Sequence, residues 1–306
     1  MRLIPSGQIR RSSDFNSDQP RGWPYVLVCL LVLTAGGWTY LSAMIVDMIV
    51  IMDMSQAGPG MGLFNRFNIF HDLPANARAA LAAICLPSAT TSFGMPAETW
   101  GWQDAAKVFV MWLMMALAMM LPSAIPMLKN YMLHQASQNL NGTGRLSVLM
   151  AFQGYLSIWL GYAVVATVAQ WGLVNASLLS PMMAPISMAF SASVLLAAGI
   201  YQFTPAKHAC LLRCWYPRFV FSSKADLMSA YREGLLQGFA CLGCCFAVMS
   251  VMFSVGLMNV IWIAILGIVM SVEKTFPSIW FYKIIGIIFI AWGSVIAILS
   301  QGGIPV

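Results

Sequence analysis

The chain has 306 residues, of which 60% are hydrophobic and only 8% are charged, and its mean hydropathy is +0.78. Since a soluble domain carries about 25% charged residues, this composition excludes an ordinary soluble protein and indicates a polytopic membrane protein. The net charge of +6 does not indicate a nucleic-acid partner, because the basic residues lie beside apolar segments, where they set topology and meet the lipid bilayer.

Seven apolar segments have about the length that a helix needs to cross a bilayer. In chain order they cover residues 24–46, 107–128, 147–170, 186–203, 234–256, 258–272 and 278–299. Spanning segments must satisfy their own backbone polar groups, so we expect an all-α transmembrane bundle of about seven spans. The sixth segment is short, and we expect it to tilt little or to end inside the protein.

The predicted organisation is a polar cytoplasmic leader at residues 1–23 and a single integral domain at residues 24–306. An external loop at about residues 47–106 joins the first two spans. Lysine and arginine are concentrated in the leader and in the connections after the second, fourth and sixth spans. Lys207 is counted in the connection after the fourth span. The positive-inside rule then predicts a cytoplasmic N-terminus and an external C-terminus.

Methionines are frequent in the first two spans. They form two helical stripes, Met44, Met48 and Met52 in the first span and Met111, Met115 and Met119 with the adjacent Met120 in the second. Thioethers are soft ligands that suit Cu(I). They also fill irregular gaps between helices, and for any single stripe core packing is the favoured explanation.

Cysteines provide a second set of soft donors. Five of the seven fall into two groups, Cys210 with Cys214 and Cys241 with Cys244 and Cys245. Thr204 followed by Pro205 predicts a helix start, which would place the first pair one turn apart on one face. The second group shares a face near the cytoplasmic end of the fifth span, where thiols stay reduced.

Two explanations of the cysteine groups are open. Thiolates that lie close together bind Zn, Cu(I) or an iron–sulfur cluster, and all five side chains are candidate ligands. Free cysteine also packs as a small apolar residue, and these spacings differ from the CxxC pairs of zinc knuckles. If the groups share a metal, we expect their sulfur atoms within about 4 Å of each other, with Met119 or Met120 lining the same cleft.

Proline and histidine add candidates near these groups. Pro122 and Pro126 interrupt the backbone hydrogen bonds of the second span near its inner end, so carbonyl groups there need other partners. His208 lies two residues before Cys210 and is a candidate extra ligand. The chain has no Walker motif, HExxH or Ser-His-Asp order, so no catalytic residue is assigned and an enzyme is the less favoured class.

Glu273 and Lys274 end the sixth span. A carboxylate at that depth in a membrane protein is usually paired or functional, because an unpaired charge is costly in apolar surroundings. The sequence offers Lys274, Lys283 and Lys129 as partners for Glu273. Both Glu273 and Lys274 are therefore predicted to be functional residues.

Four blocks of the sequence resemble a known family. They are MWLMMALAMMLPSAIPML at 111–128, YQFTPAKHACLLRC at 201–214, GFACLGCC at 238–245 and GLMNVIWIAILGIVMSVEK at 256–274. Their order and spacing are similar to those of the bacterial family described as predicted metal-binding integral membrane proteins. The resemblance implies a multi-span bundle in a bacterial inner membrane. It also marks the five clustered cysteines, Glu273 and the methionines and prolines of the second span.

The favoured function is an inner-membrane protein that binds a soft transition metal and handles or transports it. Copper is the metal that the cysteine and methionine donors favour, and its identity is left open. One alternative is a non-catalytic accessory subunit, whose small-residue faces would contact other membrane proteins in a larger complex. A further alternative is a membrane oxidoreductase that uses its thiols or a bound metal for redox chemistry.

Overall fold

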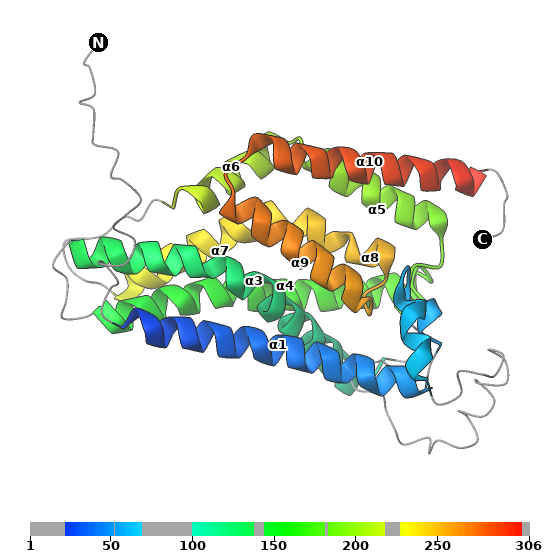
Figure 1. Cartoon of the computed structure of the whole chain (residues 1–306), viewed down its shortest axis with the longest axis horizontal. Coiled ribbons are helices and arrows are strands. Elements are labelled where there is room, and N and C mark those ends of the chain that lie inside the picture. The colour runs from blue at the N-terminus through cyan, green and yellow to red at the C-terminus, as the bar shows by residue number, and fades with distance from the viewer. Residues whose placement is uncertain are drawn as a thin grey trace, which may run out of the picture.

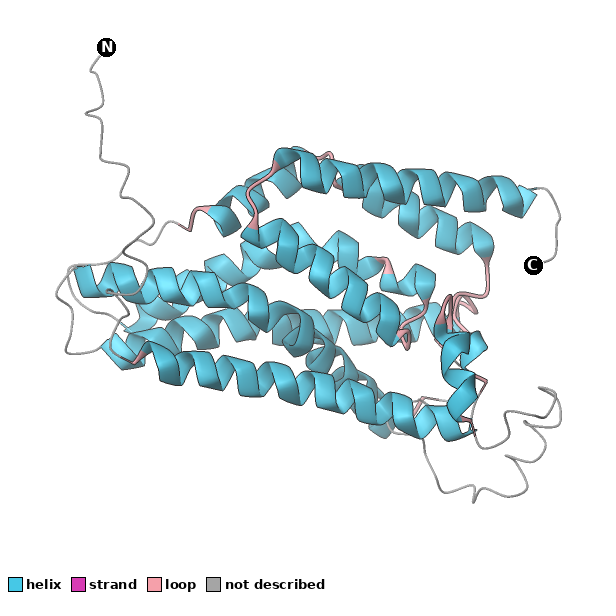
Figure 2. Cartoon of the chain, in the orientation of Figure 1, coloured by secondary structure: helices cyan, strands magenta, loops and turns pink. Residues whose placement is uncertain are grey.

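The computed structural model describes residues 22–51, 53–68, 100–137, 144–180, 183–217 and 227–301, which form a bundle of helices (Figures 1 and 2). In chain order the helices are α1 (Trp23–Ile51), the 3-10 helices η1 (Met54–Ala57) and η2 (Met61–Phe67), α3 (Trp102–Ser137), α4 (Gly144–Asn175), α5 (Met188–Tyr201), α6 (Pro205–Trp215), α7 (Leu227–Ser250), α8 (Met252–Val255), α9 (Val260–Thr275) and α10 (Ile279–Gln301). The all-α expectation is confirmed.

Each expected span coincides with a helix, but not every helix is long enough to cross a bilayer. In the described part of the chain, α1, α3, α4, α7 with α8, and α10 are long and apolar enough. The fourth expected span coincides with α5, which has 14 residues and meets the criterion only together with α6, to which it is bent by 62°. The sixth, α9, has 16 residues. By length and composition the structure thus has five spanning helices, or six if the bent pair counts as one.

The long helices run roughly antiparallel. In Figure 1, α1, α4, α7 and α10 run in one direction, while α3, α5 and α9 return in the other. The start of α1 and the end of α10 therefore lie toward opposite ends of the bundle, which agrees with termini on different sides. Which end faces the cytoplasm stays a prediction.

Glycines allow the central helices to approach closely. A Cβ atom added to Gly154 of α4 would lie 2.2 Å from the Tyr231 carbonyl oxygen, and one added to Gly234 of α7 would lie 2.0 Å from that of Ala151. Small residues at such contacts are typical of helix association in membranes. This contact fixes α7, the helix that carries three of the clustered cysteines, against α4.

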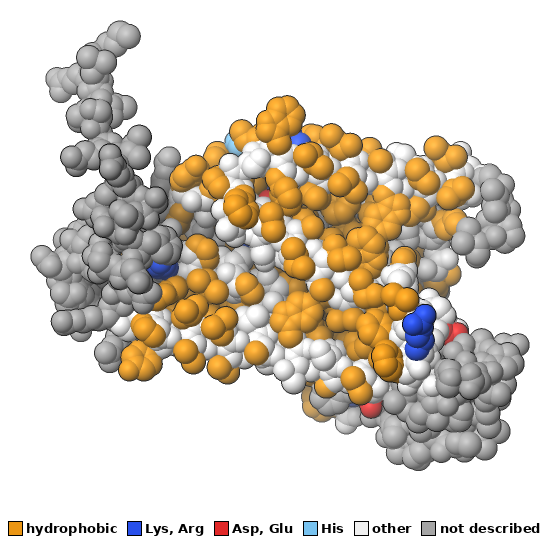
Figure 3. Space-filling model, viewed as in Figure 1, with side chains coloured by type: hydrophobic (Ala, Val, Ile, Leu, Met, Phe, Trp, Pro, Cys, Tyr) orange, Lys and Arg blue, Asp and Glu red, His pale blue; other side chains and the backbone are white. Residues whose placement is uncertain are grey.

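The outer surface is apolar. Figure 3 shows hydrophobic side chains spread over the visible face of the bundle, and charged side chains are sparse on it. Val32 of α1 and Ile298 of α10 are 63% and 70% exposed, as expected for side chains that face lipid. The bilayer is thus the natural surroundings of these helices.

The expected external loop is helical at its start. α1 continues to Ile51, and η1 and η2 follow it directly. Asn259, before α9, donates its side-chain amide to the Pro59 carbonyl at 2.9 Å, which holds this segment on the end of the bundle. Residues 69–99 of the loop and residues 1–21 of the leader lie outside the described residues.

Candidate metal centre

The short helix α6 brings the first cysteine group to the site. Its predicted start is confirmed, because the Thr204 hydroxyl accepts a hydrogen bond from the Lys207 amide at 3.3 Å and Pro205 occupies the first turn. Lys207, Leu211 and Cys214 then follow at the spacing of one helix face. Since Lys207 and Leu211 are fully buried, this face points into the bundle.

The second group lies on α7. Cys241, Cys244 and Cys245 are buried and share the face that packs into the core. The sequence placed them near one end of the fifth span. Because α7 begins at Leu227 and continues with α8 to Val255, these thiols instead lie near the middle of that helical segment.

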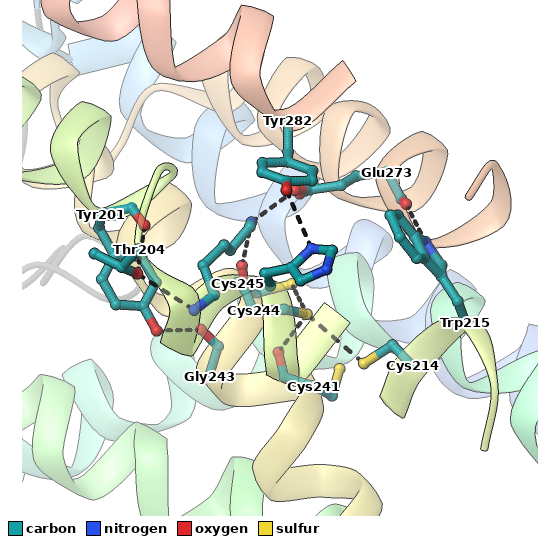
Figure 4. Close-up of polar contacts among 12 residues, drawn as sticks. Tyr201, Thr204, Cys214, Trp215, Cys241, Gly243, Cys244, Cys245, Glu273 and Tyr282 are labelled. Atoms are coloured by element: carbon teal, nitrogen blue, oxygen red, sulfur yellow. Dashed lines mark hydrogen bonds and ion pairs between the residues drawn. The ribbon is translucent and has the colours of Figure 1, made fainter. Parts of the chain in front are cut away.

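The two cysteine groups meet where α6 crosses α7 (Figure 4). The Cys214 and Cys244 sulfur atoms are 3.8 Å apart, within the expected distance, and the Cys244 and Cys245 sulfur atoms are 3.5 Å apart. Sulfur atoms around a tetrahedral ion with metal–sulfur bonds of ~2.3 Å are separated by about 3.8 Å. Among the described residues, however, no three His, Cys, Asp or Glu side chains are arranged to hold a metal ion. The sulfur contacts are therefore pairwise.

Cys241 is held by polar groups. The Lys274 ammonium lies 2.8 Å from its sulfur atom, and the Tyr155 hydroxyl lies 3.2 Å from it. Lys274 also approaches the Ser123 hydroxyl at 3.0 Å and the Met120 sulfur at 3.5 Å. The Met120 thioether and the Cys241 thiol thus contact the same ammonium group, and the role of Met120 as a metal ligand stays a prediction.

Cys210 and His208 turn toward other neighbours. A Cβ atom added to Gly243 would lie 2.5 Å from the Cys210 sulfur, so Cys210 packs directly on the α7 backbone. His208 Nδ1 lies 3.1 Å from the Tyr282 hydroxyl of α10. The metal-binding roles of Cys210 and His208 stay predictions.

The partner of Glu273 is Lys207, which corrects the sequence analysis. Lys207 Nζ lies 2.7 Å from Glu273 Oε1, and both side chains are almost fully buried. Lys207 also donates to the Cys244 carbonyl, and the Trp215 indole donates to the Glu273 carbonyl at 2.8 Å. Lys207 is therefore an interior residue that ties α6, α7 and α9 together, rather than a loop residue that sets topology.

The methionines and prolines of the second span lie on α3. Met111, Met115, Met119 and Met120 are buried, and Pro122 and Pro126 lie inside the helix. The Met120 carbonyl accepts hydrogen bonds from the Ser123 and Tyr155 hydroxyls at 2.7 and 3.1 Å, so side chains provide extra partners for the backbone just before Pro122. Met44 and Met48 are buried on α1, which packs on α3, and Met52 lies outside the described residues.

Three residues of the site were not found from the sequence. They are Lys207, Tyr155 and Trp215. A signal for Lys207 was present, because it shares a helix face with Leu211 and Cys214. The other two are common residue types in membrane helices, and only the contacts of α4 with α3 and α7, and of α6 with α9, make them part of the site.

A comparison with known families agrees with this chemistry. The sequence profile of the PpoB2 family, described as copper chaperones, matches residues 109–296, which is more than half of the chain. No curated protein and no solved structure matches. The matched region contains the candidate metal centre, whose thiol and thioether groups suit a soft cation such as Cu(I). The chain therefore belongs to the PpoB2 copper chaperone family and is a multi-pass membrane protein that handles copper.

Proposed function

We propose that Cu(I), as the cargo of this chaperone, is carried by the thiols where α6 meets α7. Cys214 and Cys244 form the first binding pair, and Cys245 and Cys241 are adjacent donors. The observation that supports this most directly is the 3.8 Å contact between two sulfur atoms from separate helices. Thiolates are soft ligands that suit Cu(I), and pairwise contacts suit its low coordination numbers better than they suit a tetrahedral ion.

The neighbouring sulfur atoms offer a route for transfer. The Cys245 sulfur lies 3.5 Å from that of Cys244, so copper could pass from one thiolate to the next by exchanging one ligand at a time. Met115 and Met111 follow Met120 in the direction of the start of α3. At a rise of 1.5 Å per residue, Met111 lies about 13 Å from Met120 along the helix axis. We propose that these thioethers guide Cu(I) toward the end of the bundle that carries η1 and η2.

A copper titration tests the binding site. Purified protein would be titrated anaerobically with Cu(I) against a chromogenic Cu(I) chelator, in the wild type and in the Cys214→Ser and Cys244→Ser variants. We expect about one tightly bound Cu(I) per chain, and affinity lowered at least ~100-fold in both variants. Cys29→Ser is the matched control, because Cys29 is exposed on α1. Equal loss in the control, or none in the site variants, would contradict the proposal.

We further propose that the protein lies in a bacterial inner membrane with its N-terminus in the cytoplasm, as the basic residues predict. Leu63 of η2 and Tyr216 after α6 are 66% and 61% exposed and lie toward opposite ends of the bundle, so each serves as a reporter. In intact cells, an impermeant maleimide should label a Leu63→Cys variant and not a Tyr216→Cys variant. The reverse pattern would invert the orientation and the direction proposed for copper.

A further inference from the structure

Lys274 is the charged residue in closest contact with the thiols. Its ammonium nitrogen lies 2.8 Å from the Cys241 sulfur, 3.0 Å from the Ser123 hydroxyl and 3.5 Å from the Met120 sulfur. None of these groups is a carboxylate. An ammonium group in such a site is stabilised only if negative charge lies nearby, because a charge removed from water is costly unless it is paired.

The other charges around the centre are matched in pairs. Lys207 and Glu273 form an ion pair at 2.7 Å, which is neutral as a unit. Arg213 of α6 and Glu233 of α7 lie 3.7 Å apart, and they form a second pair. Glu273 also interacts with Lys274, but its 2.7 Å ion pair is with Lys207, so among the described residues a sulfur atom is the candidate anion in direct contact with the Lys274 ammonium.

Copper binding would create a charge that Lys274 can match. Cu(I) held by two thiolates carries one net negative charge, whereas a divalent ion held by the same thiolates is neutral. Inside an apolar bundle the uncompensated anionic complex would be strongly disfavoured. A single fixed cation beside the thiols therefore stabilises a monovalent soft ion bound by two thiolates.

We propose that Lys274 is the counter-cation of the thiol centre and that it sets the preference of this site for monovalent over divalent soft metals. This inference rests on the proposed binding of Cu(I) by the thiols. Lys274 acts through its charge as a positioning residue, and it is not itself a ligand.

The test compares two metals that differ in charge. Ag(I) replaces Cu(I) as an air-stable monovalent ion, and Cd(II) is the divalent soft ion. Their affinities would be measured by competition with a thiol chelator for the wild type, Lys274→Met and Lys274→Arg. Lys283→Met, on α10, is the matched control for loss of a lysine from a helix.

We expect Lys274→Met to lower the Ag(I) affinity by about 100-fold or more, the effect of removing one charge within about 6 Å at an effective dielectric constant of about 20. The Cd(II) affinity should be unchanged or higher, because its dithiolate complex needs no counter-charge. Lys274→Arg should keep most of the Ag(I) affinity, since it keeps the charge, and Lys283→Met should bind both ions like the wild type.

The outcomes separate the two proposals. A wild type that binds neither Cu(I) nor Ag(I) contradicts the proposed function itself. A wild type that binds Ag(I), with a Lys274→Met variant that loses Ag(I) and Cd(II) equally, assigns Lys274 a purely structural role and overturns the inference. A rise in Ag(I) affinity in Lys274→Met would also overturn it, because the ammonium would then be blocking the metal's place. Retained Cd(II) binding shows that the variant is folded.

Discussion

Two regions of the bundle are rich in sulfur, and they differ in what surrounds the sulfur atoms. At the thiol centre, the Cys244 thiol donates to the Cys241 carbonyl at 3.1 Å, and Cys241 contacts an ammonium and a phenol. In the methionine layer between α1 and α3, Met48, Met111 and Met115 are fully buried in the hydrophobic core. Both regions contain soft donors, but only the first combines them with buried charge.

This difference explains why sulfur content alone does not locate a metal site. Methionine fills irregular gaps in any helix bundle, so a buried methionine needs no function. A buried lysine or glutamate is costly, and it persists where the surroundings pair it and give it a role. Lys207, Glu273 and Lys274 therefore identify the thiol centre more specifically than its cysteines do. The variants below are ordered from the largest expected effect to the smallest.

Breaking the buried ion pair should have the largest effect. Glu273→Ala leaves Lys207 buried without its carboxylate, so we expect the free energy of unfolding to fall by ~3–5 kcal/mol. Chemical denaturation in detergent, followed by circular dichroism, measures this change. The double variant Lys207→Met with Glu273→Met should recover most of the loss, because it removes both charges and restores apolar contacts. A Glu273→Ala variant as stable as the wild type would show that the pair contributes little.

Truncation in the methionine layer should affect stability and leave copper loading unchanged. Met115→Ala creates a cavity in the core and should cost ~2–5 kcal/mol, while Met115→Leu keeps the volume and should cost less than ~1.5 kcal/mol. Copper titration of Met115→Leu should give the wild-type affinity, with slower release to a chelator if the thioethers form the route. Loss of resting affinity in this variant would place copper in the methionine layer and remove the distinction between the two regions.

The sequence predicted the helices well because uninterrupted apolar runs leave few other structures possible in a bilayer. The expected fifth span began at residue 234, whereas α7 begins at Leu227, since residues 227–233 are more polar than a span. Thr204 and Pro205 predicted the break between α5 and α6, but the 62° bend at that break depends on tertiary contacts. The depth of the thiols in the bundle follows from the start of α7, and for this reason it was wrongly predicted.

The features of the site that depend on local helix geometry could be predicted, and those that depend on tertiary contacts could not. Helical spacing showed that Cys241, Cys244 and Cys245 share a face, which depends only on local geometry. Which residue pairs with Glu273 depends on how α6 packs on α9, and Lys207 lies far from Glu273 in the sequence. Spacing also could not decide whether Cys210 or Cys214 meets Cys244, because the crossing of α6 and α7 decides it.

Gly243→Ala tests the role of Cys210 and should have a moderate effect. The new methyl group would lie 2.5 Å from the Cys210 sulfur, so we expect a loss of ~1–3 kcal/mol and weaker copper binding as Cys214 moves from Cys244. Adding Cys210→Ala makes room for the methyl group. If Cys210 serves only in packing, the double variant should regain both stability and copper affinity. Recovery of stability without copper affinity would make Cys210 a ligand.

The smallest effect is expected for the second ion pair of α6. Arg213 and Glu233 lie 3.7 Å apart, and although the Glu233 side chain is only 11% exposed, the Arg213 side chain is 36% exposed, so solvent screens their attraction from the arginine side. Arg213→Gln should therefore change the free energy of unfolding by only ~0–1 kcal/mol, and 1 M salt should shrink even that difference, because the Debye length falls to about 3 Å. The same denaturation assay used for Glu273→Ala measures it. A loss as large as that of Glu273→Ala would mean that depth in the bundle does not separate the two pairs, and the argument that buried charge identifies the thiol centre would fail.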